Sequence, residues 1–204
     1  MGKLFGTDGI RGKANKTLTV ELAYGLGRAA AIVLAEQKPE PVFFIGKDTR
    51  ISGDMLEAAL AAGLASAGAN VFLLGVIPTP GVAYLVKNKK ADAGAVISAS
   101  HNPAQDNGIK FFAENGYKLS DAMEAEIEEF LLEQRPWPNF ENIIPGRIQN
   151  AFSYIDDYRI YLEEKFPLQL NRHNIVIDGA NGAASNIAPQ LFTHLGASVK
   201  AICC

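Results

Sequence analysis

The sequence predicts an α/β protein in which helices sandwich a mixed, mostly parallel sheet, followed by an incomplete second α/β domain of similar type. Two observations support this fold class. Short apolar runs alternate along the chain with stretches whose apolar residues recur at helical spacing, which is the pattern of layered α/β proteins. Hydrophobic residues make up 48% and charged residues 20% of the 204 positions, the composition of an ordinary globular protein with a sizeable core.

The first predicted domain covers residues 1–148. Apolar runs predict three of its strands, at 42–46, 71–75 and 93–98. Helical spacing of apolar residues predicts helices at 19–38, 52–67, 79–90 and 120–131. Hydroxyl side chains at the first positions of three of these helices, Ser52, Thr79 and Ser120, are the expected N-caps. The alternation of strand and helix favours parallel pairing of the strands.

The predicted first domain ends with a strand, a helix and a linker. Residues 109–112 are expected to form a further, antiparallel strand, which precedes the helix at 120–131. Three prolines interrupt residues 134–146, where helical or strand-like spacing is weak, so we interpret this segment as an interdomain linker. A helix is expected after it, around 152–166.

The second predicted domain covers residues 149–204 and contains a single βαβ unit. A strand at 174–178, a turn at 179–182, a helix to about 195 and a strand at 198–203 make up this unit. A two-stranded parallel sheet with one covering helix buries little apolar surface, and small domains are marginally stable. We therefore expect the second domain to be incomplete and the chain to be a fragment of a longer protein.

Charge and cysteine content exclude several classes of protein. A formal charge of −3 lacks the basic excess of a nucleic-acid or membrane-surface binder. The apolar runs are shorter than the ~18 residues of a membrane span, and residues 1–5 lack the apolar core of a secretion signal. Cys203 and Cys204 are expected to be reduced thiols, since two neighbouring cysteines are too few for a disulfide framework. These observations predict a cytoplasmic protein.

Residues 97–103, Ile-Ser-Ala-Ser-His-Asn-Pro, are the strongest candidate for a catalytic loop. A strand ends there, and small polar residues expose the Ser100 hydroxyl at the carboxyl edge of the sheet, where ligands of open α/β sheets bind. Serine needs a neighbouring base or cation to react, and His101 adjoins it while Lys110 follows on the next strand. The alternative is that Ser100 and His101 only satisfy hydrogen bonds of the loop.

Two further polar segments are candidates for the same cleft. Residues 5–12 hold three glycines and Arg11, whose planar guanidinium suits a phosphate or carboxylate; the alternative is a tight turn in which Arg11 pairs with Asp8. Residues 46–50, Gly-Lys-Asp-Thr-Arg, follow a predicted strand, and their charges either face the cleft or pair with one another. Residues 179–182 open a helix after a strand, and a tight turn is favoured there over a phosphate site.

These segments together resemble the α-phosphohexomutase family over essentially the whole chain. The matching motifs, in the family's order, are FGTDGIRG at 5–12, GKDTR at 46–50, PTP at 78–80, SASHNP at 98–103 and DNGIKF at 106–111. The serine loop followed by Asn-Gly-Ile-Lys is the most specific of them. The opening at 5–12 is most similar to the bacterial phosphoglucosamine mutase branch, and DGANGAA at 178–184 resembles the start of the family's second domain.

The resemblance implies reversible phosphoryl transfer between the 6- and 1-positions of a hexosamine phosphate, a small-molecule partner, through phosphorylated Ser100 and a hexosamine 1,6-bisphosphate intermediate and activator. It implies Mg²⁺ bound through the phosphate on Ser100, with the remaining ligands outside these 204 residues. Lys110 and Arg11 are the expected cations beside the transferring group, with His101 orienting it. A homodimer of the whole protein is possible on the same grounds. The open alternatives are a phosphomannomutase or phosphoglucomutase, and a non-catalytic module of the same fold.

Overall fold

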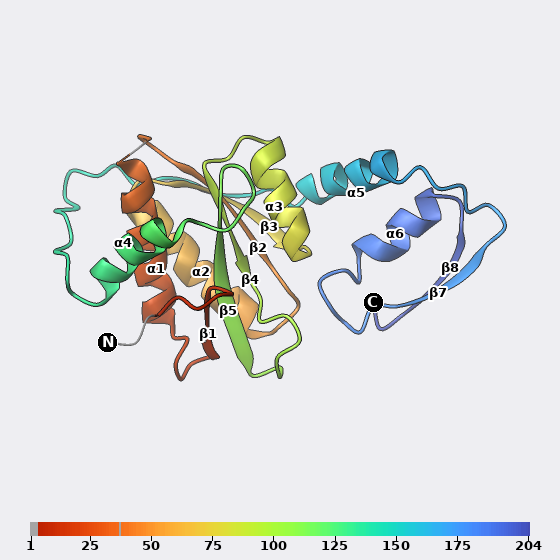
Figure 1. Cartoon of the computed structure of the whole chain (residues 1–204), viewed down its shortest axis with the longest axis horizontal. Helices are drawn as coiled ribbons and strands as arrows, with labels where there is room; N and C mark the ends of the chain where they lie inside the picture. The colour runs from red at the N-terminus through yellow and green to blue at the C-terminus, as the bar shows by residue number, and fades with distance from the viewer. Residues whose placement is uncertain (1–3, 37) are drawn as a thin grey trace.

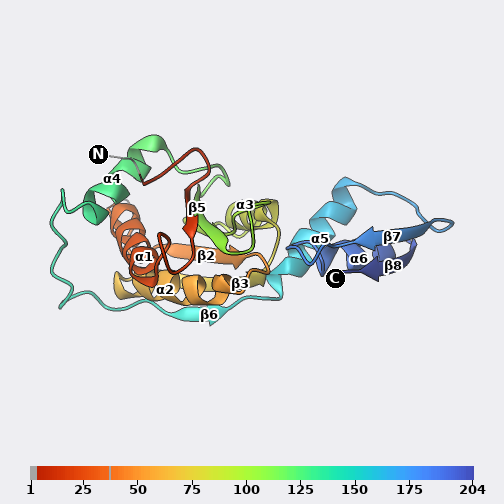
Figure 2. The same ribbon diagram turned by 90° about the horizontal axis from the view of Figure 1, so that it is seen from below.

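The computed structural model describes residues 4–36 and 38–204, and most of these residues build a helix-covered sheet at one end of an elongated molecule (Figure 1). A smaller unit lies beyond it along the long axis, and a second view agrees with this placement (Figure 2). The predicted absence of a secretion signal concerns residues 1–5, of which 1–3 lie outside the described part. No helix among the described residues is both long and apolar enough to cross a membrane.

The large sheet is mixed and mostly parallel, as predicted. Its strand order is β1-β5-β4-β2-β3-β6, with bounds β1 (Ile10–Lys13), β2 (Val42–Lys47), β3 (Asn70–Val76), β4 (Ala93–Ile97), β5 (Asp106–Ala113) and β6 (Ile148–Asn150). Strands β4, β2, β3 and β6 run parallel, whereas β5 is antiparallel to both β4 and β1. The four predicted strands are confirmed, and β1 and β6 are additions that apolar runs did not reveal.

Helices cover both faces of this sheet. Three of them, α1 (Val20–Ala35), α2 (Ser52–Ser66) and α4 (Asp121–Leu131), pack on one core, and α3 (Thr79–Asn88) packs on the other. Successive residues of β2 point to opposite faces, so Phe43 and Ile45 enter the first core and Phe44 enters the second. Because both faces are covered, β4 is buried along its whole length.

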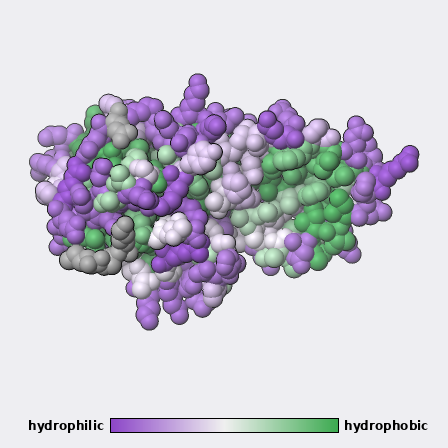
Figure 3. Space-filling view, in the orientation of Figure 1, coloured by the Kyte–Doolittle hydropathy of each residue, from purple (hydrophilic) through white to green (hydrophobic). Residues whose placement is uncertain are grey.

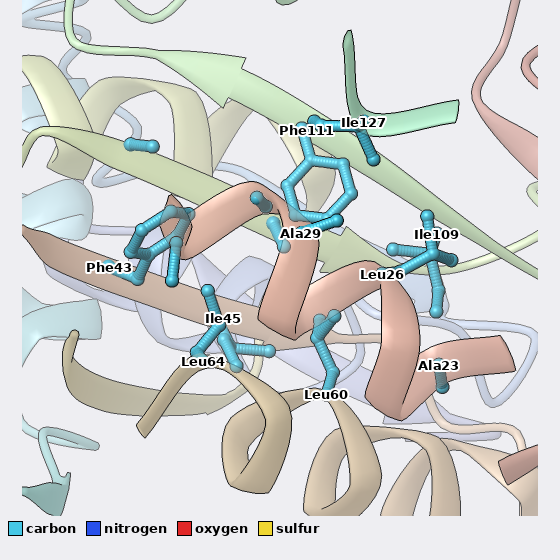
Figure 4. Close-up of a cluster of buried hydrophobic side chains, with 14 of the residues drawn as sticks. Ala23, Leu26, Ala29, Phe43, Ile45, Leu60, Leu64, Ile109, Phe111 and Ile127 are labelled. Carbon is cyan, nitrogen blue, oxygen red and sulfur yellow. The ribbon is translucent and has the colours of Figure 1, made fainter. Parts of the chain in front are cut away.

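Close packing of α1 on α2 depends on two glycines. A Cβ at Gly63 would lie 2.1 Å from the carbonyl oxygen of Tyr24, and one at Gly27 would lie 2.3 Å from that of Leu60. The two helix backbones therefore approach to a distance that any side chain would prevent. Leu60 and its buried neighbours fill the space between these helices and the sheet (Figure 4).

One of the three predicted caps is confirmed and two are wrong. Ser120 accepts a hydrogen bond from the Met123 amide at 3.3 Å and caps α4. Ser52 lies inside α2, which begins without a side-chain cap, and its hydroxyl instead accepts from the Asn107 side-chain amide at 2.9 Å. Thr79 is likewise the first helical residue of α3, after Pro78. In both cases helical geometry starts one residue earlier than the capping pattern predicts.

The smaller unit is the predicted βαβ arrangement. After residues 132–147, which contain no helix or strand, the chain adds β6 to the large sheet and continues into α5 (Tyr154–Lys165), β7 (Asn174–Asp178), α6 (Ile187–His194) and β8 (Ser198–Ile202). Strands β7 and β8 pair in parallel as a separate two-stranded sheet. A domain boundary between residues 148 and 149 stays a prediction, although β6 still hydrogen-bonds to β3 through these positions.

The smaller unit leaves much apolar surface uncovered. Figure 3 shows apolar residues gathered at its end of the molecule, and the exposed large side chains there include Val176, which is 65% exposed, together with Ile160, Phe166, Leu168 and Ile202. Cys203 and Cys204 follow β8 as free, exposed thiols. The negative charge of Asp178 raises the pKa of Cys203 above its usual value, which makes that thiol less reactive at neutral pH.

Candidate active site

The serine loop, residues 98–105 between β4 and β5, carries Ser100 at the carboxyl edge of the large sheet, as predicted. The loop leaves the sheet directly, because the Ser98 amide still donates to the Gly108 carbonyl at 2.9 Å. Ser100 is exposed and has a φ of 56°, a left-handed conformation that residues with a Cβ adopt rarely. Such backbone strain persists only where neighbouring groups hold it, and it is common at functional sites.

Asp48 and Ser98 hold the backbone of Ser100. The Ser100 amide donates to the Ser98 hydroxyl oxygen at 3.1 Å, and that hydroxyl donates to Asp48 Oδ2 at 2.7 Å. Asp48 is only 9% exposed. Strands β2 and β4 are parallel neighbours, so Asp48, one residue past β2, reaches the start of the serine loop. The sequence did not single out Ser98 as a site residue.

Arg50 joins the segment after β2 to the serine loop. One of its terminal nitrogens, Nη2, donates to the Ser100 carbonyl at 3.0 Å and to the Asn102 carbonyl at 2.9 Å. Its Nε lies 3.4 Å from Asp48 Oδ2, so the ion pair that the sequence offered as an alternative also forms. Lys47, from the same motif, pairs with Asp54 and Glu57 of α2.

His101 contacts the candidate nucleophile directly. Its Nδ1 lies 3.2 Å from Ser100 Oγ, within hydrogen-bonding distance, and the imidazole is exposed. A hydroxyl beside an imidazole can exchange its proton with that ring when it gains or loses a phosphoryl group. The sequence-based expectation that these neighbours act together is compatible with this geometry.

Arg11 and Lys110 meet at Asp8. Arg11 Nη2 lies 3.1 Å from Asp8 Oδ2, and Lys110 Nζ lies 3.5 Å from Asp8 Oδ1. The strand register explains this meeting, since Arg11 lies opposite Gly108, two residues before Lys110 on β5. Among the described residues, the side-chain polar contacts of both cations run to Asp8, so their action on Ser100 stays a prediction.

Gly108 brings Arg11 close to the base of the serine loop. A Cβ at this position would lie 3.0 Å from Arg11 Cγ and 2.8 Å from the Ser98 carbonyl oxygen. The missing side chain therefore lets the Arg11 side chain pass beside the loop two residues before Ser100. Any larger residue at 108 would have to displace either the arginine or the loop.

The smaller unit forms the opposite wall of the site. A cleft of about 440 Å³ is lined by residues from 48–50, from the serine loop and from 180–183. The Thr49 hydroxyl donates to the Asn181 carbonyl across it. Ala180 and Asn181 both have positive φ, and the Gly182 amide donates to the Gly179 carbonyl at 2.8 Å, so residues 179–182 form the tight turn that the sequence favoured.

The described residues do not by themselves fit a metal ion at this cleft. No group of three or more histidine, cysteine, aspartate or glutamate side chains converges anywhere in the described part of the chain. The Asp48 carboxylate is engaged by Ser98 and Arg50, and the Asp106 carboxylate accepts from the Asn102 side-chain amide at 3.3 Å. A magnesium ion here would need a phosphate on Ser100 and further ligands from elsewhere.

Comparisons with known proteins show the family of this chain. A model of the phosphoglucomutase/phosphomannomutase α/β/α domain I matches residues 2–136. Phosphoglucosamine mutase from Caldicellulosiruptor saccharolyticus is 56% identical over 207 residues, covering 99% of this chain and 45% of that protein. The enzyme of the same name from Heliobacterium modesticaldum is 49% identical over 222 residues, covering 100% of this chain and 48% of its own.

Solved structures give the same assignment. A phosphoglucomutase/phosphomannomutase family protein from Burkholderia thailandensis superposes with a TM-score of 0.80 at 25% identity, covering 98% of this chain and 44% of its own. A putative phosphomannomutase from Thermus thermophilus gives 0.80 at 28% identity, with 97% and 45% covered. The chain thus spans about half the length of the relatives it matches, and the resemblance read from its motifs is confirmed. It belongs to the phosphoglucomutase/phosphomannomutase family, the α-phosphohexomutases.

Proposed function

We propose that this chain is the phosphoserine-bearing part of a phosphoglucosamine mutase, which interconverts glucosamine 6-phosphate and glucosamine 1-phosphate. The observation that carries the proposal is the exposed Ser100 hydroxyl, held in a left-handed turn at the sheet edge with the His101 imidazole 3.2 Å away. The choice of sugar is supported by the name shared by the relatives at 49–56% identity. The more distant solved structures carry phosphomannomutase or phosphoglucomutase names.

The proposed reaction is a pair of phosphoryl transfers at one hydroxyl. In the first, the bond between phosphorus and Ser100 Oγ breaks while a sugar hydroxyl forms a new bond to that phosphorus, giving a hexosamine 1,6-bisphosphate. The sugar hydroxyl loses a proton and the serine oxygen gains one, and His101 is close enough to Ser100 Oγ to carry protons there. The bisphosphate then turns over and returns its other phosphoryl group to Ser100 by the reverse chemistry.

Negative charge on the transferring group has to be neutralised, since such transition states are stabilised mainly by electrostatics. We propose Arg11 and Lys110 for this role, which requires that the sugar phosphate draws them from Asp8. Magnesium, when bound through the phosphate on Ser100, would supply further positive charge. Its remaining ligands would come from outside these 204 residues, because the described residues do not by themselves make a metal site at this cleft.

The proposal is tested by intact-mass analysis of the protein isolated from cells. We expect a fraction of molecules to carry one phosphoryl group, mapped by fragmentation to Ser100 and absent from Ser100→Ala. Ser120→Ala is a matched control, because it removes a serine hydroxyl that only caps α4, and it should keep the modification. Complete absence of phosphate at Ser100, including after incubation of the longer protein with glucose 1,6-bisphosphate, would contradict the proposal.

Sugar specificity is tested by assaying the longer protein with glucosamine, glucose and mannose 6-phosphates. A preference for glucosamine 6-phosphate is expected, and a preference for mannose or glucose 6-phosphate would reassign the chain to the other branch. The 204 residues alone are expected to have negligible mutase activity, because the cleft has only two walls here. A folded protein that carries no phosphate at Ser100 in the intact-mass analysis would favour the non-catalytic alternative.

The cellular setting follows from the same proposal. A mutase acting on sugar phosphates works where these metabolites are made, so we place the protein in the cytoplasm, with a sugar phosphate as its small-molecule partner and no role for nucleic acid or membrane. A homodimer of the longer protein stays a prediction, tested by its mass in solution.

A further inference from the structure

The serine loop needs contacts with the rest of the domain to keep its conformation. Ser100 keeps a left-handed backbone although it is exposed and is not glycine, and the loop has small polar side chains that bury little surface. Within the loop itself, the Asn102 amide donates to the Ala99 carbonyl at 3.1 Å. The Asp106 amide also donates to the Pro103 carbonyl at 2.9 Å, and the Ala14 amide donates to the Gln105 carbonyl at 3.0 Å, which attaches the far end of the loop. Neither of these two contacts reaches residues 100–102, so the orientation of that part of the loop has to be set by other contacts.

Arg50 provides such contacts. A single guanidinium nitrogen bonds the carbonyl oxygens of Ser100 and of Asn102, on either side of His101. Hydrogen bonds from a charged donor are about twice as strong as neutral ones. The Arg50 side chain is only 11% exposed, and it lines the same cleft as the serine hydroxyl. The bonds therefore join rigid β2 to the two residues that flank the imidazole.

Asp48 keeps the guanidinium in place. Its Oδ1 accepts from the Arg50 backbone amide at 3.0 Å, while Oδ2 accepts from the Ser98 hydroxyl and pairs with Arg50 Nε. The Asp48 amide also donates to the Ile97 carbonyl at 3.0 Å, which continues the pairing of β2 with β4. The buried Asp48 carboxylate thus aligns both groups that hold Ser100. These are the Ser98 hydroxyl, which accepts from the Ser100 amide, and the Arg50 guanidinium, which donates to the Ser100 carbonyl.

We propose that Arg50 is the positioning residue of the serine loop, which fixes Ser100 in its left-handed conformation and presents a positive charge to the phosphoryl group on that serine. The second half of this statement rests on the proposed function. Lys47 and Arg11 pair with carboxylates, as Arg50 does with Asp48, but only Arg50 among these three also donates to carbonyls of the serine loop.

The test uses the 204-residue chain with phosphoserine inserted at position 100 during translation. The second ionisation of a phosphoserine, with a pKa near 6, is followed by ³¹P NMR, and the backbone amide resonance of residue 100 is followed in the same samples. A nearby cation favours the dianion and lowers this pKa. Repeating the titration in a His101→Asn background removes the imidazole that lies beside Ser100, so the remaining shift reports the guanidinium.

Arg50→Ala is expected to raise the phosphoserine pKa by about half a unit or more and to move the amide resonance of residue 100. Arg147→Ala is the matched control: it removes the same charge from an exposed residue just before β6, at the opposite edge of the sheet, and should shift the pKa by less than about 0.2 unit because salt screens distant exposed charges. Ser98→Ala, which keeps Arg50, should move the amide resonance while leaving most of the pKa lowering intact.

The proposal is overturned if Arg50→Ala folds and behaves as Arg147→Ala does in both measurements. If Arg50→Ala fails to fold, Arg50→Lys takes its place in the test. Lysine keeps the charge but lacks the planar guanidinium, so the phosphoserine pKa should stay lowered while the amide resonance of residue 100 moves. An unchanged resonance in that variant also overturns the proposal. Because translation installs the phosphate, a failure of the mutase function would appear only as unphosphorylated Ser100 in cells and would leave this measurement unaffected.

Discussion

The six-stranded unit and the two-stranded unit are built from the same alternation of strand and helix, yet they differ sharply in burial. In the larger unit every residue of β4 is buried, because helices cover both faces of the sheet. In the smaller unit β7 alternates between exposed and half-buried residues, and Val176 is 65% exposed. The comparison teaches that the local pattern sets the elements, whereas the number of covering layers sets the core.

The largest expected difference between the two units lies in the cost of shortening an apolar side chain. Leu60→Ala removes a fully buried side chain and should lower the free energy of unfolding by about 2–5 kcal/mol. Val176→Ala, on exposed β7, should cost about 0.5 kcal/mol or less. Urea unfolding followed by the fluorescence of Trp137, which packs on Phe130 of the larger unit, measures the first effect. Equal losses for both variants would remove the distinction.

Adding a methyl group at a glycine should also lower the free energy of unfolding more in the larger unit than in the smaller one, by a smaller difference. Gly63→Ala places a Cβ 2.1 Å from the Tyr24 carbonyl oxygen, and the overpacking should cost about 1–3 kcal/mol, outweighing the gain of up to about 1 kcal/mol for replacing a helical glycine. At Gly182 the nearest atom is 3.3 Å away, so Gly182→Ala should cost about 0.5 kcal/mol or less. Thermal unfolding by circular dichroism compares the two, and a stabilised Gly63→Ala would show that α1 and α2 move apart easily.

The smallest expected effect is the pH dependence that Lys47 contributes in the larger unit. Desolvation lowers the pKa of Lys47, but hydrogen bonds and charge from Asp54 and Glu57 outweigh it, and the folded pKa lies above the ordinary 10.5. The stabilisation is therefore complete below pH 10.5 and is lost as the pH rises through the folded value.

Lys47→Met should flatten the decline in unfolding free energy above pH 10.5, measured by urea titrations across that range. Only the slope is diagnostic, since the substitution also leaves the buried Glu57 carboxylate without its ammonium partner. Lys200→Met, on exposed β8, is the control and should keep the wild-type slope. A decline that is unchanged in Lys47→Met would show that other groups cause it.

The elements with the strongest local signals could be predicted from the sequence. The apolar runs of β2, β3 and β4 are continuous because both faces of these strands are covered, and Ser120 precedes a clear helical stripe. Strand β6 gave no such signal: its three residues are exposed, and it exists only through pairing with β3, far earlier in the chain. Edge strands of this kind depend on tertiary contacts that a local pattern does not contain.

The candidate site shows the same division. Ser100 and His101 could be predicted because a strand, a small polar loop and a proline follow one another in the sequence. The role of Arg50 could not be predicted, because its acceptors are backbone carbonyls 50 and 52 residues away. Every residue has such a carbonyl, so the sequence does not indicate which one accepts a hydrogen bond. For Arg11 the sequence offered Asp8 as an alternative partner, and this ion pair forms, whereas the contact of Lys110 with the same carboxylate follows from the register of β1 on β5.

The hydroxyl of Thr49 reaches the Asn181 carbonyl, and so ties the rim that carries the serine to a turn of the less protected unit. The two sides of the cleft then differ in their resistance to local unfolding. Local opening of the β7–β8 unit would release one side and leave Ser100, His101 and Arg50 in place. The width of the cleft above Ser100 thus depends on the less protected two-stranded unit, whereas the orientation of the Ser100 hydroxyl depends on the well-buried six-stranded unit.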